Sequence, residues 1–383
     1  MKIKVMTVFG TRPEAIKMAP LIKELESRSE IESIVCVTAQ HRQMLDQVLS
    51  VFNIKPDYDL DIMKSGQSLA DITSIVLKDL DQVVKKVQPD IILVHGDTTT
   101  TLAASLAAFY NQVTLGHVEA GLRTYDKYSP YPEEVNRQVT GILADIHFAP
   151  TKVAKYNLVI EGKDKNSIYV TGNTGIDALK TTVKEDYTHE IIEKIGSDRM
   201  ILLTAHRREN LGENMRSMFS AIKRIVDEFD DVQVVYPVHL NPLVRATANE
   251  VFGDCDKIHL IEPLEVFTFH NFLNKSYMIM TDSGGIQEEA PSLGKPVLVL
   301  RDTTERPEGV EAGTLKLAGV DEENIYNLTK ELLTDKEVYD NMSKSSNPYG
   351  DGNASKYITN IIINKLSKEN STDEALLSQQ ASS

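Results

Sequence analysis

Short apolar runs rich in β-branched residues alternate along the chain with longer segments in which apolar positions recur every three or four residues. Runs of the first kind are typical of buried strands, and segments of the second kind are typical of helices that pack on a sheet. Their alternation predicts an α/β fold with parallel sheets. The first series of strands is expected near residues 3–9, 33–38, 91–95, 113–118, 146–149 and 167–170.

The clearest helical segment is 69–88, where one stripe of the helix is apolar and the opposite face carries charges such as Asp79 and Lys86. Segment 14–27 has the same spacing of apolar residues but contains Pro20, which is expected to kink the helix. We expect a helix at both segments.

A second series of strands begins after TGNTG at 171–175, where two glycines interrupt the periodicity. We therefore expect two Rossmann-like doubly wound domains, residues 1–170 and 171–353, which face a central cleft at the carboxyl ends of their strands. The polar, unpatterned stretch 369–383 predicts a disordered tail. The strands of the second series are expected near residues 200–204, 233–237, 258–261, 277–281 and 297–300.

Composition narrows the classes of function. The 383 residues contain no apolar run approaching the roughly 20 residues that cross a bilayer, so no membrane insertion is expected. The N-terminus is interpreted as a buried strand and not as a signal peptide. A net charge of −15 argues against general nucleic-acid binding but permits a small phosphorylated ligand bound by local cations. Cys36 and Cys255 have neither disulfide-like nor zinc-like spacing, which fits a cytoplasmic protein.

The motif TDSGGIQEEA at 281–290 follows a predicted strand and opens a predicted helix. Such a turn exposes backbone N–H groups to an anion, and Glu289 is placed to accept hydrogen bonds from a ribose. Glycines that serve only packing are an equally weighted alternative. The chain has neither a Gly-x-Gly-x-x-Gly after a strand nor a P-loop, so hydride transfer and P-loop phosphoryl transfer are disfavoured.

Three cations are candidates for binding phosphate. Arg12 follows the first predicted strand, and Lys17 comes soon after it. Arg306, in RDTTERPEG at 301–309, lies just past another predicted strand. A single arginine of this kind is more often a surface charge. Together with the Ser-Gly-Gly turn, these cations suggest a clamp for a diphosphate, because arginine binds phosphate through two parallel hydrogen bonds.

Three carboxylates are candidates for acid/base chemistry, because each follows a predicted strand or a proline-bounded loop: Asp97 in HGDTTTT, Glu119 in HVEAGLRT and Glu133 in SPYPEEVNRQ. Burial at a strand end raises a carboxyl pKa toward useful values. The alternatives are a helix N-cap for Asp97 and a helix-dipole role for Glu133. No comparable structural role is evident for Glu119.

Histidines also follow strands, namely His206 in TAHRREN and His239 in YPVHLNP, while His41 lies in TAQHRQM. A lone histidine is more often structural than catalytic. None of them has the spacing of metal ligands, so neither a metal nor a cofactor is expected.

At this point a family resemblance is evident. The motifs GTRPEAIKMAP, TAQHRQMLDQV, VHGDTTTT, GHVEAGLRT, SPYPEEVNRQ, TGNTGIDA, TAHRREN, TDSGGIQEEAPSLGKPVLVLRDTTERPEG and NPYGDG closely resemble the bacterial non-hydrolysing UDP-N-acetylglucosamine 2-epimerases, from about residue 2 to about 365. The resemblance implies a two-domain GT-B-type fold and a homodimer. It also implies a helix at about 354–367 that packs back on the first domain.

The resemblance further implies interconversion of UDP-GlcNAc with UDP-ManNAc for cell-surface polysaccharides, through elimination of UDP to 2-acetamidoglucal and re-addition. It places catalytic roles on Asp97, Glu119, Glu133 and His206. UDP-sugar contacts fall on Arg12, Lys17, Phe269, Ser283, Gly284, Gly285, Glu289 and Arg306. An activating second UDP-GlcNAc would contact Gln40, His41, Gln43, Gln67, Arg207 and His239.

One position departs from the family pattern, because Gly66 stands where some members have an arginine. This departure concerns one contact of the second site, and with it the strength of activation by UDP-GlcNAc. The alternatives are a hydrolysing epimerase, a GT-B glycosyltransferase and a UDP-sugar sensor without catalysis. Three predicted cleft carboxylates argue against the last two, since neither requires proton chemistry at C2.

Overall fold

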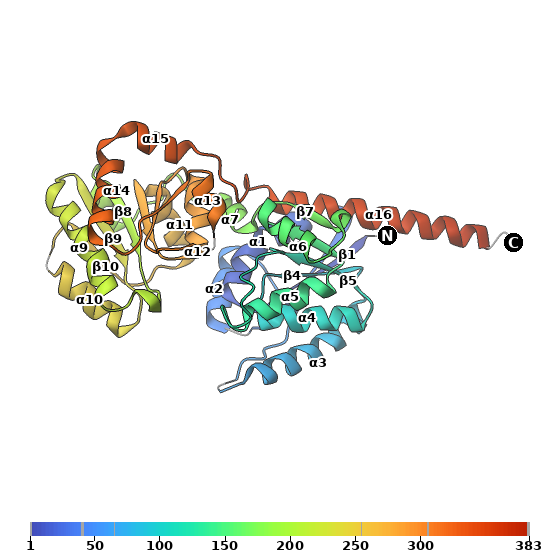
Figure 1. Cartoon of the computed structure of the whole chain (residues 1–383). Helices are drawn as coiled ribbons and strands as arrows, with labels where there is room; N and C mark the ends of the chain where they lie inside the picture. Colours follow the sequence, from blue (N-terminus) through green and yellow to red (C-terminus); the bar gives the residue numbers. More distant parts are fainter. Residues whose placement is uncertain (1, 40–41, 65, 254, 305, 381–383) are drawn as a thin grey trace. The chain divides into compact units, whose positions relative to one another are not determined.

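The computed structural model describes residues 2–380 except 40–41, 65, 254 and 305, and it does not describe the side chains of 43–44, 208 and 368–380. The chain divides into two compact units (Figure 1). Unit 1 comprises residues 1–181 and 350–383, and unit 2 comprises residues 182–349.

Unit 1 is built on a seven-stranded sheet in which every neighbouring pair is parallel, with the order β3-β2-β1-β4-β5-β6-β7. Its strands are β1 (Ile3–Phe9), β2 (Ile31–Val37), β3 (Tyr58–Asp59), β4 (Ile91–His95), β5 (Thr114–Val118), β6 (Ile146–Ala149) and β7 (Ile168–Val170). Its helices are α1 (Arg12–Glu26), α2 (Arg42–Val51), α3 (Leu69–Val87), α4 (Thr99–Tyr110), α5 (Glu133–Leu143), α6 (Lys152–Ile160), α7 (Thr174–Thr182, ending one residue into unit 2) and α16 (Ala354–Gln380), with a 3-10 turn η1 (Lys165–Ser167).

Alternating side chains of β1 supply two cores, one on each face of the sheet. Val5 and Phe9 pack in the core that includes α1 and α16, whereas Met6 and Val8 pack in the core that includes α3 and α4. Both faces of the sheet are therefore covered, as parallel sheets require.

Unit 2 repeats this plan with a six-stranded parallel sheet in the order β10-β9-β8-β11-β12-β13. Its strands are β8 (Arg199–Thr204), β9 (Val232–Pro237), β10 (Ile258–Ile261), β11 (Met278–Thr281), β12 (Val297–Val299) and β13 (Leu315–Leu317). Its helices are α8 (Glu190–Ile195), α9 (Glu213–Glu228), α10 (Pro242–Phe252), α11 (Val266–Lys275), α12 (Gly284–Glu289), α13 (Pro307–Glu311), α14 (Glu322–Thr334) and α15 (Lys336–Lys344), with 3-10 turns η2 (Arg208–Asn210) and η3 (Ala290–Leu293).

Both sheets reverse their strand order at one place, and that place is where ligands bind in open α/β sheets. The reversal lies between β1 and β4 in unit 1 and between β8 and β11 in unit 2. The loops that follow these four strands contain Arg12, Asp97, His206 and Ser283 or lead directly into them. The fold therefore places several of the predicted site residues beside a switch point.

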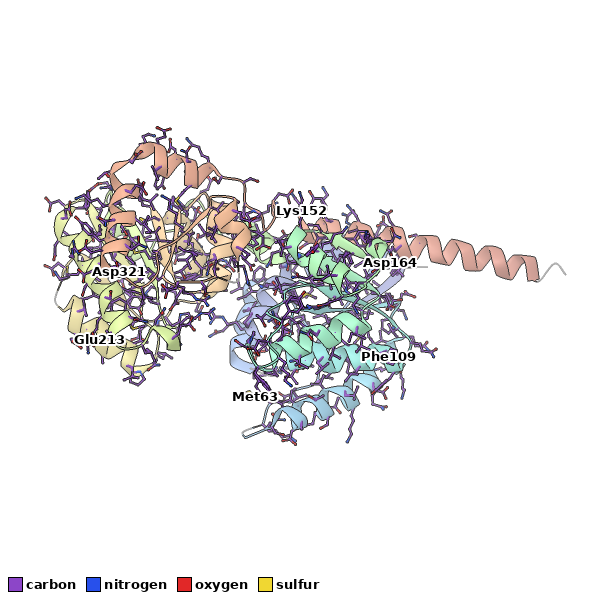
Figure 2. All side chains as sticks on the ribbon, viewed as in Figure 1. Met63, Phe109, Lys152, Asp164, Glu213 and Asp321 are labelled. Carbon is purple, nitrogen blue, oxygen red and sulfur yellow. The ribbon has the colours of Figure 1, made fainter. Side chains whose placement is uncertain are left out.

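Not every large apolar side chain is buried. Phe109 on α4 and Met63 before α3 are exposed (Figure 2). Single exposed apolar residues are common on protein surfaces and require no special explanation.

The predicted α/β class with two doubly wound sheets is confirmed, and every predicted strand is present. The short edge strands β3 and β13 were not predicted. Helix α1 runs through Pro20, and the structure changes unit after residue 181, whereas the sequence places the boundary at 170–171.

Helix α16 continues through residues 369–380, and residues 381–383 lie outside the described residues. Disorder of the tail 369–383 stays a prediction.

Candidate active site

A buried glutamate links the two loops at the switch point of unit 1. Glu14 accepts hydrogen bonds from the backbone N–H groups of Gly10 (3.0 Å) and Thr11 (2.8 Å), next to β1. It also accepts one from the hydroxyl of Thr98 (2.7 Å), next to β4. Burial raises the pKa of Glu14, although these hydrogen bonds lower it. The loop with Asp97 is thereby fixed to the start of α1, where Arg12 is the first residue.

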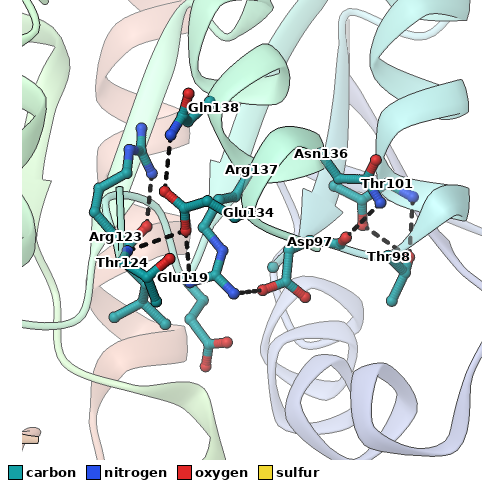
Figure 3. Close-up of polar contacts among 12 residues, drawn as sticks. Asp97, Thr98, Thr101, Glu119, Arg123, Thr124, Glu134, Asn136, Arg137 and Gln138 are labelled. Atoms are coloured by element: carbon teal, nitrogen blue, oxygen red, sulfur yellow. Dashed lines mark hydrogen bonds and ion pairs between the residues drawn. The ribbon is translucent and has the colours of Figure 1, made fainter. Parts of the chain in front are cut away.

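Asp97 does not cap α4. The N-cap is Thr98, whose side chain accepts a hydrogen bond from the backbone N–H of Thr101 (3.1 Å). Asp97 instead meets two consecutive residues of α5, since Arg137 Nη2 lies 2.6 Å from its carboxylate and Asn136 donates to its carbonyl oxygen (2.9 Å) (Figure 3). The helix-cap interpretation of Asp97 is therefore wrong.

The pKa of Asp97 is raised, chiefly by burial. Arg137 and Lys17 act in the opposite direction, while the carboxylates of Glu119 and Glu133 add to the rise. Glu119 and Glu133 therefore both lie close enough to Asp97 to affect it electrostatically.

Glu119 follows β5 in the left-handed backbone region, with φ of 61°. Its carboxylate pairs with Lys17 and accepts a hydrogen bond from Asn173 Nδ2 (2.9 Å). His95 Nε2 lies 3.8 Å away, and burial lowers the pKa of this histidine to about 4, so its imidazole is neutral at physiological pH. Unusual backbone geometry of this kind is concentrated at functional sites.

Glu133 and Glu134 differ sharply in their surroundings. Glu134 accepts hydrogen bonds from the backbone of Thr124 (3.0 Å) and Tyr125 (3.1 Å) and from Gln138 (2.8 Å), and thereby fixes the loop before α5 (Figure 3). Within the described part of the chain, the buried Oε2 of Glu133 accepts no hydrogen bond. Both glutamates stand in the first turn of α5, so the helix-dipole role considered for Glu133 is compatible with the structure, whereas the loop is held by Glu134 alone of the two.

In unit 2, the Ser-Gly-Gly turn and Arg306 come together. Ser283 precedes α12, and a methyl group placed on Gly284 would lie 3.8 Å from Nη2 of Arg306. Arg306 also pairs with Glu288. A guanidinium beside the backbone N–H groups at the start of a helix is suited to binding a phosphate.

Glu289 and Phe269 lie on α12 and α11, in the same unit. The carboxylate of Glu289 lies 3.7 Å from His270 Nε2, and the other nitrogen of this ring shares a hydrogen bond with the Thr182 hydroxyl (2.7 Å). Phe269 is partly buried and packs against a hydrophobic cluster of unit 2. The cluster that Phe269 packs against includes Ile286 of α12, and a contact of Phe269 or Glu289 with a nucleotide remains a prediction.

His206 follows β8, and its ring stacks on that of His239, with ring centres 5.3 Å apart and an angle of 15° between the rings. Arg207 donates from Nε to the carbonyl oxygen of Asp282 (3.0 Å). Arg207 and His239, two members of the predicted second site, therefore lie beside His206, which is predicted to be catalytic. In unit 1, Gln67 Nε2 donates to the carbonyl oxygen of Ile62 (2.9 Å).

Three further predicted residues of the second site cannot be placed: Gln40 and His41 lie outside the described residues, and so does the side chain of Gln43. Among the residues that the structure does describe, no group of three or more His, Cys, Asp or Glu is arranged to bind a metal ion. No helix in that same part of the chain has the length and apolarity needed to span a membrane.

A family model described as UDP-N-acetylglucosamine 2-epimerase matches residues 23–363. The chain belongs to the UDP-N-acetylglucosamine 2-epimerase family. The UDP-N-acetylglucosamine 2-epimerase of Bacillus subtilis is 69% identical over 362 residues, which are 94% of this chain and 95% of the relative. The predicted membership of an epimerase family is confirmed.

Solved structures of this family have the same fold. The UDP-GlcNAc 2-epimerase of Neisseria meningitidis, bound to UDP-GlcNAc, has a TM-score of 0.84 and 51% identity, and the match covers 94% of this chain and 100% of that one. The enzyme of Methanocaldococcus jannaschii, in complex with UDP-GlcNAc and UDP, has a TM-score of 0.75 and 33% identity over 94% of this chain and 99% of that one. The GT-B-type pair of Rossmann-like domains is therefore confirmed.

Sequence reasoning missed Glu14, Arg137 and Asp282, each of which fixes a site loop or a site side chain in this epimerase family member. Glu14 stands three residues after Thr11, which is the spacing of a capping box and was a usable signal. No local pattern indicates that Arg137 meets Asp97, because 39 residues separate Asn136 from Asp97 and only the fold brings α5 to this loop.

Proposed function

We propose that the chain catalyses the reversible epimerisation of UDP-GlcNAc to UDP-ManNAc at C2, without net hydrolysis. The observation that supports this proposal most directly is the group of three carboxylates at the edge of the unit 1 sheet, in which burial raises the pKa of Asp97. Relatives of this chain are UDP-GlcNAc 2-epimerases, and one of them was solved with UDP-GlcNAc bound.

Elimination avoids an unfavourable step in this reaction. The C2 proton is not acidified by a carbonyl group, so a free carbanion at C2 would form very slowly. In the proposed route a base removes the C2 proton, the C2–H electrons form the C1=C2 bond, and UDP leaves with the electrons of the C1–O bond. The products are 2-acetamidoglucal and UDP. Re-addition of a diphosphate oxygen at C1 with protonation of C2 on the other face completes the epimerisation.

The diphosphate needs positive charge and hydrogen-bond donors as it leaves. Arg306 and the Ser283–Gly285 turn are assigned this role in unit 2, and Arg12 is assigned it in unit 1. Lys17 pairs with Glu119 and thereby also adjusts the charge of the acid/base group. Glu289 and Phe269 are assigned to the ribose and the base of the nucleotide.

Protonation on either face of C2 requires more than one acid/base group. Asp97, Glu119 and Glu133 are proposed for these roles, with His206 as a further acid or orienting group. A carboxyl whose pKa is raised retains a proton at higher pH than a surface carboxyl does, so Asp97 is suited to return a proton as well as to remove one.

The proposal extends to the setting of the reaction. We infer a cytoplasmic homodimer that supplies ManNAc for cell-surface polysaccharides and is activated by UDP-GlcNAc at a second site that includes Gln67, Arg207 and His239. The stacked rings of His206 and His239 support a connection between the two sites, because one histidine belongs to each set.

The test is incubation with UDP-GlcNAc in D2O, followed by NMR of the sugar signals. We expect UDP-ManNAc that carries deuterium at C2 and an intact bond to UDP. Release of free ManNAc would instead identify a hydrolysing enzyme. UDP binding without any C2 exchange over hours would refute the epimerase proposal and favour a transferase or a sensor.

A further inference from the structure

Asp282 follows β11 at the switch point of unit 2 and has no role in the reaction proposed above. Its side chain is completely buried, with 0% of the residue exposed. A buried carboxylate is destabilising unless several donors surround it. Its partners therefore indicate what it contributes to the site.

Among the described residues, the hydrogen-bond donors to one carboxylate oxygen come from the loop after the neighbouring strand β8. Oδ2 of Asp282 accepts from the backbone N–H of His206 (2.8 Å), from that of Arg207 (2.8 Å) and from Asn210 Nδ2 (3.2 Å). The carboxylate thus fixes the backbone on which His206 is mounted.

The other oxygen faces the imidazole of the same residue. Oδ1 lies 3.5 Å from His206 Nδ1 and is buried, and within the described part of the chain it accepts no hydrogen bond. The His206 side chain is 42% exposed, so part of the ring is accessible to a ligand. Catalytic hydrogen bonds in ligand-free structures are often long and shorten when a ligand binds.

We propose that Asp282 is a positioning residue for His206, which orients the imidazole and holds the proton on Nδ1 so that Nε2 is the nitrogen presented to substrate. The proposal rests on the proposed function, because it assigns His206 a role in that reaction. It goes further in naming the tautomer and the residue that selects it.

Physical chemistry supports the selection of one tautomer. A carboxylate is only an acceptor, so its oxygen favours the imidazole in which Nδ1 carries the proton. In the Ser-His-Asp triads a buried aspartate performs this function, and replacing it with asparagine reverses the tautomer with little change in geometry. In Asp282→Asn the amide oxygen can still accept from the two backbone N–H groups, while the amide nitrogen would face Nδ1.

The other charged groups around this imidazole are Arg207, beside it in the chain, and His239, stacked on it. The pKa of His206 is lowered by burial and by both of these groups, whereas Asp282 raises it. Removing the charge of Asp282 should therefore lower the pKa of His206 further.

A double-mutant comparison distinguishes positioning of His206 from a purely structural role of Asp282. A purely structural role would lower kcat equally with and without His206. We expect Asp282→Asn to lower kcat by about 100-fold or more, in the range of general acid/base catalysis, with little change in UDP binding. In a His206→Gln background the same substitution should have almost no further effect. The matched control is Asp231→Asn, an exposed aspartate of the same unit that pairs with Arg199, which should leave kcat unchanged.

Long-range nitrogen–proton NMR of histidine-labelled protein provides the second measurement. In the wild type the His206 signals should show a proton on Nδ1, and in Asp282→Asn they should show it on Nε2. An unchanged tautomer, or an equal loss of kcat with and without His206, would overturn the proposal. Because the tautomer is measured without substrate, it is independent of the D2O experiment: failure of C2 exchange alone would refute the proposed function and not the Asp282–His206 pair.

Discussion

Identical side chains differ in role here because their surroundings differ. Glu133 and Glu134 are neighbours, yet Glu134 is fully buried and satisfied by two backbone N–H groups, whereas an oxygen of Glu133 is buried without a described hydrogen bond. Replacing a satisfied carboxylate disrupts a loop, whereas replacing an unsatisfied one removes a group available to a substrate. Proton chemistry is therefore better assigned to Glu133 than to Glu134.

Asp97 is the residue whose replacement best separates catalysis from folding. We expect Asp97→Asn to retain UDP binding and to lose turnover by a factor of about 10² to 10⁴, because the amide cannot exchange the C2 proton. Steady-state rates and UDP titrations measure the two properties separately. Asp79→Asn, on the exposed face of α3, is the control and should behave like the wild type. Near-normal epimerisation by Asp97→Asn would remove Asp97 from the chemistry.

The same variant has a predicted pH signature. Because burial raises the pKa of Asp97 in the folded chain, its ionised form is disfavoured there relative to the unfolded chain. The contribution of this carboxyl to stability is thus greatest at low pH and falls as the pH rises through the raised pKa. The free energy of unfolding of Asp97→Asn, relative to the wild type, should therefore increase as the pH rises above the ordinary aspartate pKa of 3.8, as measured by urea titrations. A decrease would show that the ion pair with Arg137 outweighs burial.

Strand-end reasoning found the residues that face a ligand more readily than those that support them. Asp97, Glu119 and His206 each stand directly after an apolar run, so their place in the fold is evident from the sequence. Asp282 also follows a strand, but its partners are backbone N–H groups of a loop 75 residues away. Backbone donors have no signature in a sequence, so supporting roles of this kind require the structure.

At the scale of elements, an uninterrupted apolar run determined whether a strand could be predicted. The strands β7 (Ile-Tyr-Val) and β12 (Val-Leu-Val) have only three residues each, yet both are apolar throughout and were predicted. In β3 (Tyr-Asp) and β13 (Leu-Lys-Leu) no two apolar residues are adjacent. An edge position does not explain the difference, because the edge strands β7 and β10 were predicted as well.

Three adjacent strands of unit 1 each contain a buried histidine: His95 in β4, His117 in β5 and His147 in β6. Their pKa values are lowered, mainly by burial, to about 4, about 3 and about 4. A lowered histidine pKa means that the unfolded chain takes up the proton first as the pH falls. This contribution to stability is present above about pH 6.5 and is lost as the pH falls toward 4.

His147→Gln tests this element-scale effect, because the residue is 1% exposed and glutamine does not titrate in this range. Relative to the wild type, the variant should gain about 2 kcal/mol in free energy of unfolding between pH 7 and pH 5, as follows from a shift from 6.5 to about 4. Urea titrations at both pH values measure the difference. Val118→Ala, which removes buried carbon from β5 but no titrating group, should show the same loss at both pH values.

At the scale of the whole molecule, the chain leaves unit 1 after residue 181 and returns to it at residue 350. A buried aspartate holds the returning segment. Asp177 in α7 accepts hydrogen bonds from the backbone N–H groups of Ala354 (3.1 Å) and Ser355 (2.6 Å) at the start of α16. Periodicity predicts two series of strands, but it cannot show that the last helix belongs to the first series. Only the family resemblance indicated that packing.

The contribution of α16 can be estimated from its buried face. Ile358, Ile362 and Leu366 pack in the same core as Met18 and Leu21 of α1. Burial of each such side chain contributes about 1.5 to 3 kcal/mol, so the three together contribute at most about 9 kcal/mol. That upper estimate is comparable to the net stability of a whole domain, about 5 to 15 kcal/mol. Unit 1 is therefore expected not to remain folded without α16.

Removing residues 350–383 should consequently unfold unit 1 and leave unit 2 folded, because unit 2 is a continuous segment whose two cores contain no residue of α16. Hydrogen exchange read by peptide mass spectrometry measures this directly: β1 and β4 should lose protection, and β8 and β11 should retain it. Removing only 369–383 is the matched control, since it keeps Ile358, Ile362 and Leu366, and both sheets should remain protected. Protection of β1 in the shorter chain would mean that α1 and the sheet are stable without the returning helix, and that α16 contributes less than its buried area suggests.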